Sequence, residues 1–434
     1  MPALPQATFD SRPITPLPQR ILLVENSRTF TSMLRAAIEQ RLELPVSVAS
    51  TLEEAGELLD SEGGWFLVLT GLVLADGHRD RVVDYFVDRG LPTIVVSGVY
   101  DEGLRKRVLQ QQIIDYVLKN TPGSIDYLVW LVQRLERNRR ISALVVDDSP
   151  SARAYAASLL GMYGYHVSEA ADGASALQLI ETDPAIRLVI VDQEMPGMDG
   201  VELTRRLRAL RARDKVAVIG ISGNADPSLI PRFLKNGAND FLRKPFSREE
   251  FFCRISQNVD QLELIGTLQD LATRDFLTGL PNRRSFLEQS QRQLGQNRTG
   301  AITVAMLDID HFKHINDSLG HEAGDQALRA VAAVLQAHTR PHDLSARFGG
   351  EEFCMLVNDL DEPRSIEYFE QLRQAVAALQ LQFGESTLRM TVSIGLCHMP
   401  THHGSLHQLI TEADRQLYLA KAGGRNRVCS QQLP

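Results

Sequence analysis

Short apolar runs alternate with stretches of helical periodicity over the first 260 residues, and this pattern occurs twice. One copy begins RILLVENSRTF at residue 20, and the other begins SALVVDDSPSAR at residue 142. Each copy continues with further near-continuous apolar strands separated by helical segments. Apolar strands that alternate with helices are typical of a parallel sheet covered on both faces. The pattern therefore predicts two α/β domains, at 20–137 and 142–260.

The pattern changes in the last third of the chain. A strand at 301–310 precedes a helical stretch, and two apolar-aromatic runs then meet at Gly349-Gly350. Glycine allows the positive φ angles that a two-residue hairpin turn requires. A further helix, a strand at 388–397 and a terminal helix follow. A hairpin with helices on a mostly antiparallel sheet predicts an α+β domain at 270–430.

Three segments precede or join these domains. Residues 1–19 contain five prolines and predict an extended tail. Residues 124–140 are expected to form a helix between the first two domains, and residues 248–274 a longer helical connector. The connector carries an apolar stripe made of Ile255, Val259, Leu262, Leu268 and Leu271. Packing on its own domain and a coiled coil between two copies explain this stripe equally well.

Composition narrows the class of protein. The 434 residues are 44% apolar and 23% charged, which suffices for about three domains that each bury a core. The net charge of −8 argues against broad binding to nucleic acid or to anionic membranes. The N-terminus lacks the features of a signal peptide, and no apolar run approaches the ~20 residues that span a bilayer. The four cysteines lack metal-binding spacing, so we expect small buried residues in a reducing, cytoplasmic compartment.

Polar residues follow the strands of the second repeat. They are Asp147, Asp148, Asp192, Ser222 and Lys244. In a doubly wound sheet, functional groups gather at the carboxyl ends of the strands. Three carboxylates in one crevice repel each other unless a cation lies among them, and Mg²⁺ suits such oxygen ligands. A metal-activated aspartate can accept a phosphoryl group as an acyl phosphate, which the lysine and the serine would then contact.

This set resembles the flavodoxin-like receiver domain of two-component response regulators. The likeness extends to MPGMDG after Asp192 and to Lys-Pro at 244–245. It implies that a cognate histidine kinase phosphorylates Asp192. The implied Mg²⁺ ligands are Asp147, Asp148 and Asp192, and the implied switch residues are Ser222, Phe241 and Lys244.

The first repeat keeps the fold pattern without this chemistry. Its acidic pair has become Glu25-Asn26, and a gap-free alignment places Gly71 at the position of Asp192. Asp76 is near in sequence but belongs to the following loop. The other positions are kept by Ser97, Tyr116 and Lys119. Because glycine offers no nucleophile, we interpret the first repeat as a degenerate receiver used for packing or dimerisation.

The last third carries its own charged set, made of Asp308, Asp310, Glu351, Lys421 and Arg425. If the strand that ends in the aspartates neighbours the hairpin, Asp308 and Glu351 can share divalent cations, with the Ile309 carbonyl as a third oxygen. Lys421 and Arg425, four residues apart after a helical stretch, would face one way and bind phosphates. Such a set is usual in phosphoryl or nucleotidyl transfer.

This third resembles the GGDEF family of diguanylate cyclases, of whose signature GGEEF (349–353) is an accepted form. The likeness implies a palm-like domain with a ferredoxin-like core that condenses two GTP into cyclic di-GMP and pyrophosphate. Mg²⁺, or Mn²⁺ in its place, would be held by Asp308, the Ile309 carbonyl and Glu351. Glu352 would lie beside the reacting centre, and the choice of general base between the two glutamates stays open. The implied GTP-binding residues are Lys313, Asn316, Asp325, Gly349, Gly350, Lys421 and Arg425, of which Asn316 and Asp325 match groups that contact guanine.

Arg340 and Asp343 precede the hairpin at the offset where the family has its product-inhibition site. Arginine can stack on guanine and donate to it, and aspartate can accept from the guanine N1 and N2 hydrogens. The alternative is a surface ion pair. A second arginine usually assists, and Arg364 and Arg373 are both candidates.

The sequence thus predicts a phosphorylation-regulated diguanylate cyclase. Its twofold-symmetric product needs two GTP, so a C2 homodimer is the expected active form. One alternative is a signalling adaptor that binds GTP or cyclic di-GMP without turnover. Another is a different nucleotide cyclase or polymerase, although Asn316 and Asp325 favour guanine. A DNA-binding regulator is disfavoured because no basic recognition helix follows the receivers.

Overall fold

The structure is a computed structural model. It describes residues 19–77, 79–98, 102–110, 113–224, 226, 228–295, 300–383, 386–400 and 405–433. The chain divides into two compact units, Met1–Glu263 and Leu264–Pro434. The extended tail predicted at 1–19 lies outside the described residues except for residue 19.

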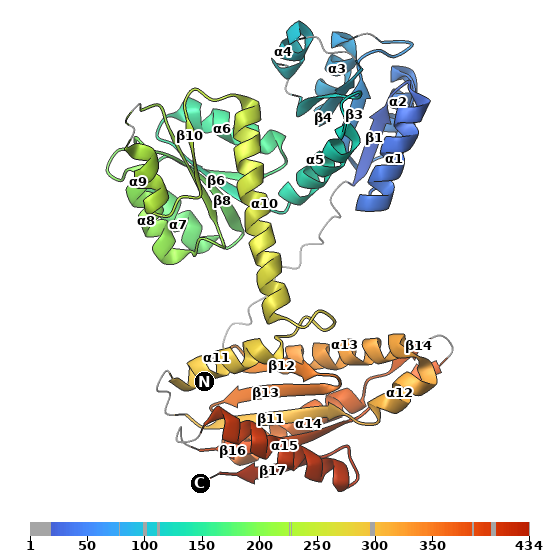
Figure 1. Ribbon diagram of the computed structural model, residues 1–434, viewed down its shortest axis with the longest axis vertical. Helices are drawn as coiled ribbons and strands as arrows, with labels where there is room; N and C mark the ends of the chain where they lie inside the picture. Colours follow the sequence, from blue (N-terminus) through green and yellow to red (C-terminus); the bar gives the residue numbers. More distant parts are fainter. Residues whose placement is uncertain are drawn as a thin grey trace, which may run out of the picture. The chain divides into compact units, whose positions relative to one another are not determined.

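The first unit begins with a parallel sheet of five strands in the order β2-β1-β3-β4-β5 (Figure 1). Its strands are β1 (Arg20–Val24), β2 (Val46–Ala49), β3 (Trp65–Gly71), β4 (Thr93–Ser97) and β5 (Asp115–Leu118). Its helices are α1 (Arg28–Leu42), α2 (Leu52–Ser61), α3 (Asp80–Val87), α4 (Glu102–Gln110) and α5 (Ser124–Asn138). The strands are continuous apolar runs because helices cover both faces of the sheet. The helix predicted at 124–140 is α5, which packs on this sheet's own domain.

A second parallel sheet follows, in the order β10-β9-β8-β6-β7, which repeats the first order when it is read from the opposite edge. Its strands are β6 (Ser142–Val146), β7 (His166–Ala170), β8 (Ile186–Asp192), β9 (Ala217–Ser222) and β10 (Asp240–Arg243). Its helices are α6 (Pro150–Met162), α7 (Gly173–Thr182), α8 (Gly200–Leu210) and α9 (Leu229–Lys235). The side chains of Ser149, Asp172 and Asp199 cap three of these helices by accepting from backbone N–H groups.

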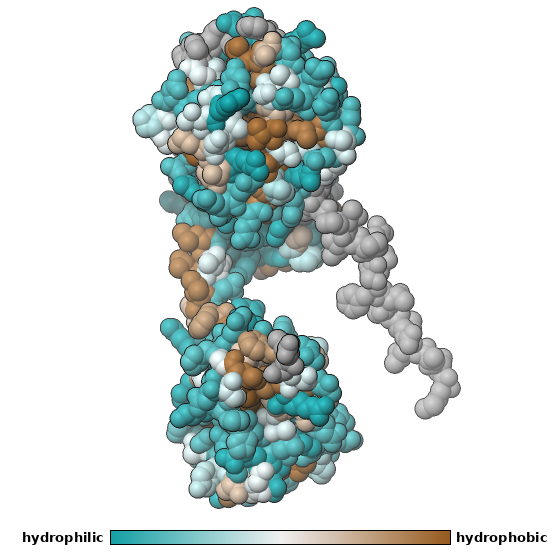
Figure 2. Space-filling view, turned by 90° about the vertical axis from the view of Figure 1, so that its right-hand side faces the viewer, coloured by the Kyte–Doolittle hydropathy of each residue, from teal (hydrophilic) through white to brown (hydrophobic). Residues whose placement is uncertain are grey.

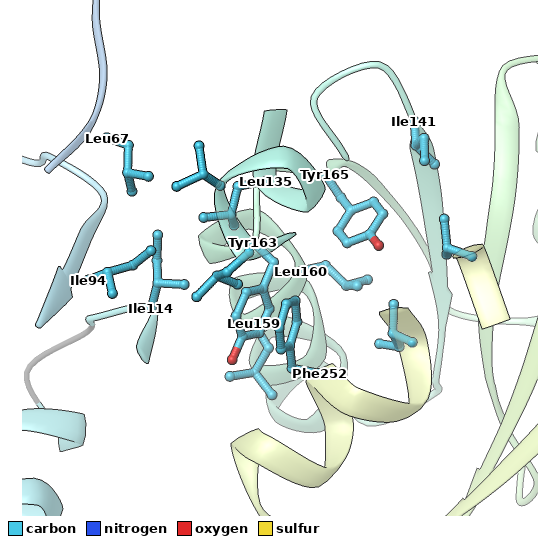
Figure 3. Packing of buried hydrophobic residues seen from close by; sticks show 14 of the residues in the cluster. Leu67, Ile94, Ile114, Leu135, Ile141, Leu159, Leu160, Tyr163, Tyr165 and Phe252 are labelled. Atoms are coloured by element: carbon cyan, nitrogen blue, oxygen red, sulfur yellow. The ribbon is translucent and has the colours of Figure 1, made fainter. Parts of the chain in front are cut away.

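One apolar core continues from the first sheet into the second (Figure 3). In Figure 3, Ile94 and Ile114 of the first domain lie near Tyr163 of the second. The ring of Tyr163 stacks on Phe252 of helix α10 (Arg248–Thr273), with 3.9 Å between centroids. Because both domains contribute to this core, they fold as one unit with the first part of α10.

The connector helix changes character along its length. Ile255, Val259 and Leu262 are buried in the shared core. Beyond them, Leu268 is 56% exposed and Leu271 is 66% exposed, and Figure 2 shows apolar side chains exposed along the connector. The predicted stripe therefore packs on its own unit in its first half only.

The second unit is built on a sheet of five strands in the order β12-β13-β11-β16-β17. Its strands are β11 (Ile302–Ile309), β12 (Leu344–Gly349), β13 (Glu352–Asn358), β16 (Val392–Met399) and β17 (Val428–Gln432), and a separate hairpin consists of β14 (Leu381–Phe383) and β15 (Ser386–Leu388). Its helices are α11 (Arg283–Gly295), α12 (Phe312–Leu319), α13 (His321–His338), α14 (Glu362–Ala377) and α15 (Leu406–Ala422). The β16–β17 pair is parallel and the other pairs are antiparallel.

Several sequence expectations need correction. The strand predicted at 388–397 begins at Val392, because Leu388 belongs to the separate hairpin. Strand β17 was not anticipated. The cysteines are not all buried, since Cys253 is exposed while Cys354 and Cys397 are buried. Within the described part of the chain, none of the helices combines the length and the apolar character that a membrane crossing requires.

Candidate functional sites

An acidic cluster forms where β6 and β8 end side by side. Asp147, Asp148 and Asp192 each place a carboxylate oxygen within 4.8 Å of the others. The Nζ of Lys244 lies 3.0 Å from Asp147 Oδ2 and 2.6 Å from Asp192 Oδ1. The N–H of Glu194 donates to Asp192 Oδ2 at 2.7 Å. The carboxylates predicted from separate strands are thus gathered at one edge of the sheet, with a lysine bridging two of them.

The electrostatics of this cluster favour a cation. Burial raises the pKa of Asp192, while the hydrogen bond and the charge of Lys244 oppose the rise. Burial lowers the pKa of Lys244, but its hydrogen bonds to Asp192 and Asp147 outweigh this effect and leave the pKa raised. The Lys244 ammonium contacts two of the three carboxylates but offsets only one negative charge, so negative charge remains for a cation to balance. The hard oxygen donors therefore fit Mg²⁺.

The remaining residues of this set occupy the neighbouring strands. Ser222 is buried at the end of β9, beside β8, and its Oγ accepts from the N–H of Asn224 at 2.9 Å. Phe241 is buried too, and its ring packs against Phe233 with 5.4 Å between centroids. A cavity of about 310 Å³ lies next to the cluster, lined by Asp147, Asp192 and Lys244 and by apolar side chains.

In the first domain a glutamate fills the corresponding place. Val24 pairs with Thr70 as Val146 pairs with Val191, so Gly71 stands at the strand end where the second domain has its aspartate. A Cβ built on Gly71 would collide with Glu25 Oε2. This oxygen lies 2.5 Å from Lys119 Nζ, and the Glu25 side chain is 2% exposed. The lysine is thus neutralised within the domain itself.

Asp76 does not replace the missing nucleophile. Its two carboxylate oxygens accept from the N–H groups of Leu52 and Glu53, each at 2.9 Å. The carboxylate therefore caps the N-terminus of α2, as its place in the loop suggested.

In the second unit, β11 lies directly beside the hairpin. Asp308 pairs with Glu352 across the β11–β13 ladder, and the N–H of Ile309 donates to the Glu351 carbonyl at 3.3 Å. Gly349 pairs with Glu352, so the turn itself is Gly350-Glu351 rather than Gly349-Gly350. Gly350 has φ of +53°, which explains the glycine there. The turn places Glu351 next to the end of β11.

Asp308 is the centre of this site. The pKa of Asp308 is raised to about 6, chiefly by burial; the charges of Glu351 and Glu352 add to the rise, and Lys421 opposes it. Lys421, in the last turn of α15, places its Nζ 2.7 Å from Asp308 Oδ2. A buried carboxylate beside two further carboxylates needs positive charge nearby. The donor set again fits a divalent cation with oxygen ligands.

Arg425 is not on a helix with Lys421, which corrects the expectation. Helix α15 ends at Ala422, and Gly424 and Arg425 have positive φ angles of +113° and +63°. Two consecutive glycines stop the helix, so the four-residue spacing does not set the direction of the Arg425 side chain. Arg425 lies exposed on the loop between α15 and β17.

The residues expected to contact guanine lie on two consecutive helices. Asn316 is on α12 and Asp325 is on α13. A Cβ built on Gly324 would collide with Asn316 Oδ1, so the asparagine amide lies directly over that glycine. Lys313 is exposed in the first turn of α12. The sequence analysis missed Gly324; a glycine inside a helix, where it costs about 1 kcal/mol relative to alanine, was the available signal.

Arg340 and Asp343 form a tight pair. Arg340 Nε donates to Asp343 Oδ2 at 2.7 Å, and Arg340 Nη2 donates to Asp343 Oδ1 at 2.9 Å. The N–H of Asn358 donates to the same Oδ1 at 3.0 Å. The Asp343 side chain is 1% exposed and that of Arg340 is 40% exposed. In this structure the aspartate is therefore used internally, and the arginine alone faces solvent.

The two candidate second arginines also have acidic partners. Arg364 lies 3.8 Å from Asp361, and Arg373 lies 2.8 Å from Glu370. Arg373 also donates to Asn426 Oδ1 at 2.6 Å. The geometry favours neither as an assistant of Arg340.

Comparison with known proteins identifies two families along the chain. Residues 272–427 match the family described as diguanylate cyclase, GGDEF domain, and residues 143–256 match the response regulator receiver domain. The response regulator PleD of Caulobacter vibrioides is 30% identical over 296 residues, which cover 66% of this chain and 64% of that protein. The diguanylate cyclase DgcP of Pseudomonas aeruginosa is 38% identical over 159 residues, 36% of this chain and 24% of that protein. The chain thus spans less than two thirds of these relatives.

One solved structure is matched over almost its whole length. A crystal structure described as a two-component system response regulator/GGDEF domain protein is 40% identical, with a TM-score of 0.53, and the match covers 56% of this chain and 99% of that one. The receiver and GGDEF resemblances of the second and third domains are confirmed, whereas the receiver identity of residues 20–137 stays a prediction. The chain belongs to the two-component response regulators that carry a GGDEF domain.

Proposed function

We propose that the protein is a diguanylate cyclase that condenses two GTP into cyclic di-GMP and releases two pyrophosphates. One observation carries this proposal: the strand register sets Asp308 opposite Glu352, beside Glu351, with the Lys421 ammonium 2.7 Å from Asp308. Carboxylates next to a cation are the arrangement that nucleotidyl transfer requires. The family match and the cyclases among the relatives support the same reading.

In the proposed reaction, the 3′-hydroxyl oxygen of one GTP bonds to the α-phosphorus of the other, and the bond to pyrophosphate breaks. Asn316 and Asp325 would hold guanine, while Lys313, Lys421 and Arg425 would contact the triphosphate. The hydroxyl proton passes to a carboxylate, and the assignment to Glu351 or Glu352 stays open. Bound Mg²⁺ supplies Lewis acidity at the phosphate, and its ligands would be Asp308, the Ile309 carbonyl and Glu351.

A twofold-symmetric dimer is part of the proposal. Each GGDEF domain is proposed to hold one GTP, so two domains must face each other to close the cyclic product. The exposed Leu264, Leu268 and Leu271 of α10 offer an apolar stripe on which two copies can pair. We propose the cytoplasm, where GTP is available, as the place of action.

Phosphorylation of Asp192 by a histidine kinase is the proposed input. A phosphoryl group there would draw the ammonium of Lys244, which already contacts Asp192. Two residues further on, Phe246 stacks on Phe251 of α10 with 5.4 Å between centroids. Movement of the lysine therefore reaches the start of the connector within a few residues. The proposed output is a higher effective concentration of paired cyclase domains.

Cyclic di-GMP is proposed to inhibit through Arg340 and Asp343. Because Asp343 is buried, the solvent-facing guanidinium of Arg340 would make the first contact. Arg340→Ala is expected to weaken inhibition by added cyclic di-GMP about tenfold or more, since hydrogen bonds to charged groups are strong. The measured quantity is the ratio of inhibited to uninhibited rate, which does not depend on the folded fraction. Arg329→Ala, an exposed change on α13, serves as the control; unaltered inhibition in Arg340→Ala contradicts this role.

The experiment that tests the activity is turnover of GTP by the purified full chain with Mg²⁺, with products separated by chromatography. Cyclic di-GMP is expected from the wild type and from Asp414→Asn, an exposed change on α15. Asp308→Asn is expected to lose activity at least 100-fold, since it removes a charged ligand. GTP binding without any product would contradict the cyclase and favour an adaptor. A different guanine nucleotide as the product, such as cyclic GMP, would contradict the condensation of two GTP.

A further inference from the structure

Asp310 stands two residues after Asp308, and the proposed reaction does not use it. Its side chain is buried, and both carboxylate oxygens are occupied. Ser393 Oγ donates to Oδ1 at 2.6 Å, and Thr391 Oγ1 donates to Oδ2 at 2.7 Å. The backbone N–H of Asn426 also donates to Oδ2, at 3.0 Å. These bonds connect the end of β11 to β16 and to the loop after α15.

This environment is unlike that of a metal ligand. A carboxylate that binds a metal must turn a lone pair toward the ion, whereas Oδ2 of Asp310 already accepts two hydrogen bonds. Asp308 differs, because its Oδ2 faces the ammonium of Lys421. Asp308 and Asp310 therefore have different roles, although they lie only two residues apart.

The loop that Asp310 holds is a strained one. Arg425 and Asn426 have φ of +63° and +46°, a left-handed conformation that costs a residue with a side chain about 1 kcal/mol or more. Such backbone persists only where surrounding bonds fix it. Here the Asp310 carboxylate binds the Asn426 N–H, and Arg373 donates to the Asn426 side chain at 2.6 Å. The N–H of Arg425 donates to the Ala420 carbonyl at 3.0 Å.

We propose that Asp310 is a positioning residue for Arg425. Its carboxylate holds the left-handed loop, so that the Arg425 guanidinium is presented to a triphosphate near Lys421 at the end of α15. This assignment rests on the proposed function, because GTP is the ligand that Arg425 would contact. The state of the loop itself does not depend on GTP.

Two substitutions separate positioning from charge. In Asp310→Asn, the amide oxygen can take the place of Oδ2 and accept from Asn426, while the amide nitrogen donates to Ser393 Oγ. Asp310→Ala removes every bond. We expect Asp310→Ala to raise KM for GTP about tenfold to hundredfold with a smaller change in kcat, and Asp310→Asn to stay within about threefold of the wild type.

A double-mutant cycle tests the route through Arg425. Once Arg425→Ala has removed the guanidinium, adding Asp310→Ala is expected to raise KM little further, because the two changes remove the same contact. Thr391→Val is the matched control; it removes one hydrogen bond to Asp310 but leaves the Asn426 bond, and KM should stay near that of the wild type. If the two substitutions raise KM additively, Asp310 does not act through Arg425.

A second readout does not need GTP. Trypsin cleaves after arginine, and limited digestion of the full chain followed by mass spectrometry reports cleavage at Arg425 and Arg427. We expect faster cleavage in Asp310→Ala and wild-type cleavage in Asp310→Asn. If the wild type fails to turn over GTP, the proposed function fails, while this digestion still decides whether Asp310 holds the loop. Equal cleavage rates in all variants overturn the proposal. The proposal is also overturned if Asp310→Asn weakens GTP turnover as much as Asp310→Ala does and raises the Mg²⁺ concentration that turnover requires.

Discussion

Glu25 and Gly71 show how two repeats of one fold diverge at a strand end. The Glu25 side chain fills the space above Gly71 and pairs with Lys119 at 2.5 Å. In the second domain, Asp192 pairs with Lys244 in the corresponding place. In both domains the lysine thus pairs with an acidic side chain, and in the first domain this acid is a glutamate that follows the neighbouring strand.

This packing predicts that one substitution does not restore phosphorylation. Gly71→Asp would collide with Glu25 and bury a second carboxylate beside it, which should lower stability by about 1–3 kcal/mol. The combination Glu25→Asp, Asn26→Asp and Gly71→Asp rebuilds the acidic cluster and should accept a phosphoryl group from a small-molecule donor. The measurement is phosphoprotein formation in an Asp192→Asn background. Phosphorylation of the Gly71→Asp variant without the other two changes would contradict this account.

Gly324 gives a second prediction. A methyl group there would displace the Asn316 amide, so Gly324→Ala should raise KM for GTP about tenfold. The new Cβ would also lie 3.2 Å from Phe312 Cζ. The helix itself gains about 1 kcal/mol from alanine, which offsets this crowding, so thermal stability should change little. Gly161→Ala, at a helical glycine with nothing near its Cβ position, is the matched control. An unchanged KM in Gly324→Ala would mean that Asn316 does not contribute to guanine binding.

Sequence reasoning located the charged residues but not all of their partners. Motif spacing is enough to bring Asp308 and Glu351 together, because a strand register follows from a hairpin and its neighbour. The ion pair of Arg340 and Asp343 is local, and sequence reasoning offered it as an alternative. The contact of Glu25 with Lys119 and the bond from the Asn358 N–H to Asp343 join segments that are distant in the sequence. Such contacts have no local signature.

At the scale of elements, helices α5 and α10 are joined by a buried arginine. The Arg134 side chain is 1% exposed. Its guanidinium donates to Asp260 at 2.7 Å, to both carboxylate oxygens of Glu263 at 3.0 Å, and to Asn138 at 2.7 Å. A buried charge with this many partners ties the first domain to the connector helix. The first domain thereby has a structural role in holding α10.

Removal of this arginine should loosen the connector. We expect Arg134→Ala to lower the free energy of unfolding of the first unit by about 2–3 kcal/mol, somewhat less than for a fully buried pair because Asp260 and Glu263 still reach water. Hydrogen exchange at 248–263 should become faster. Arg137→Ala is the control; its half-exposed side chain pairs with Glu263 at 3.5 Å and should contribute less than about 1 kcal/mol. Equal exchange in both variants would contradict the role of Arg134.

The periodicity of apolar residues was sufficient to predict some of these elements but not their packing partners. Alternating apolar strands and helices predicted the parallel sheets, since strands buried on both faces have a strong signal. The apolar stripe of 248–274 left two explanations open, because periodicity does not identify the partner surface. Strand β17 was missed because VCSQQ is short and half polar, and it is defined by pairing with β16 rather than by its own pattern.

In the whole molecule, one continuous helix, α10, runs from the unit that contains Asp192 into the unit that contains Asp308. Residues 248–263 of α10 belong to the first unit, and the remainder of the helix belongs to the second. The shared core and Arg134 fix the first part, while the leucines of the second part are exposed. In the proposed scheme, a change at Asp192 would reach the GGDEF domain through the pairing of two such helices.

We propose that the state of the receiver controls cyclic di-GMP synthesis, and a comparison of two proteins tests this control. The full chain and its Asp192→Asn variant are incubated with GTP and Mg²⁺, with and without beryllofluoride, and cyclic di-GMP is quantified by chromatography. The account predicts that beryllofluoride raises the rate of the wild type about tenfold or more, as a gain in effective concentration allows, and leaves the variant unstimulated. Equal stimulation of both proteins, or none in the wild type, would contradict it.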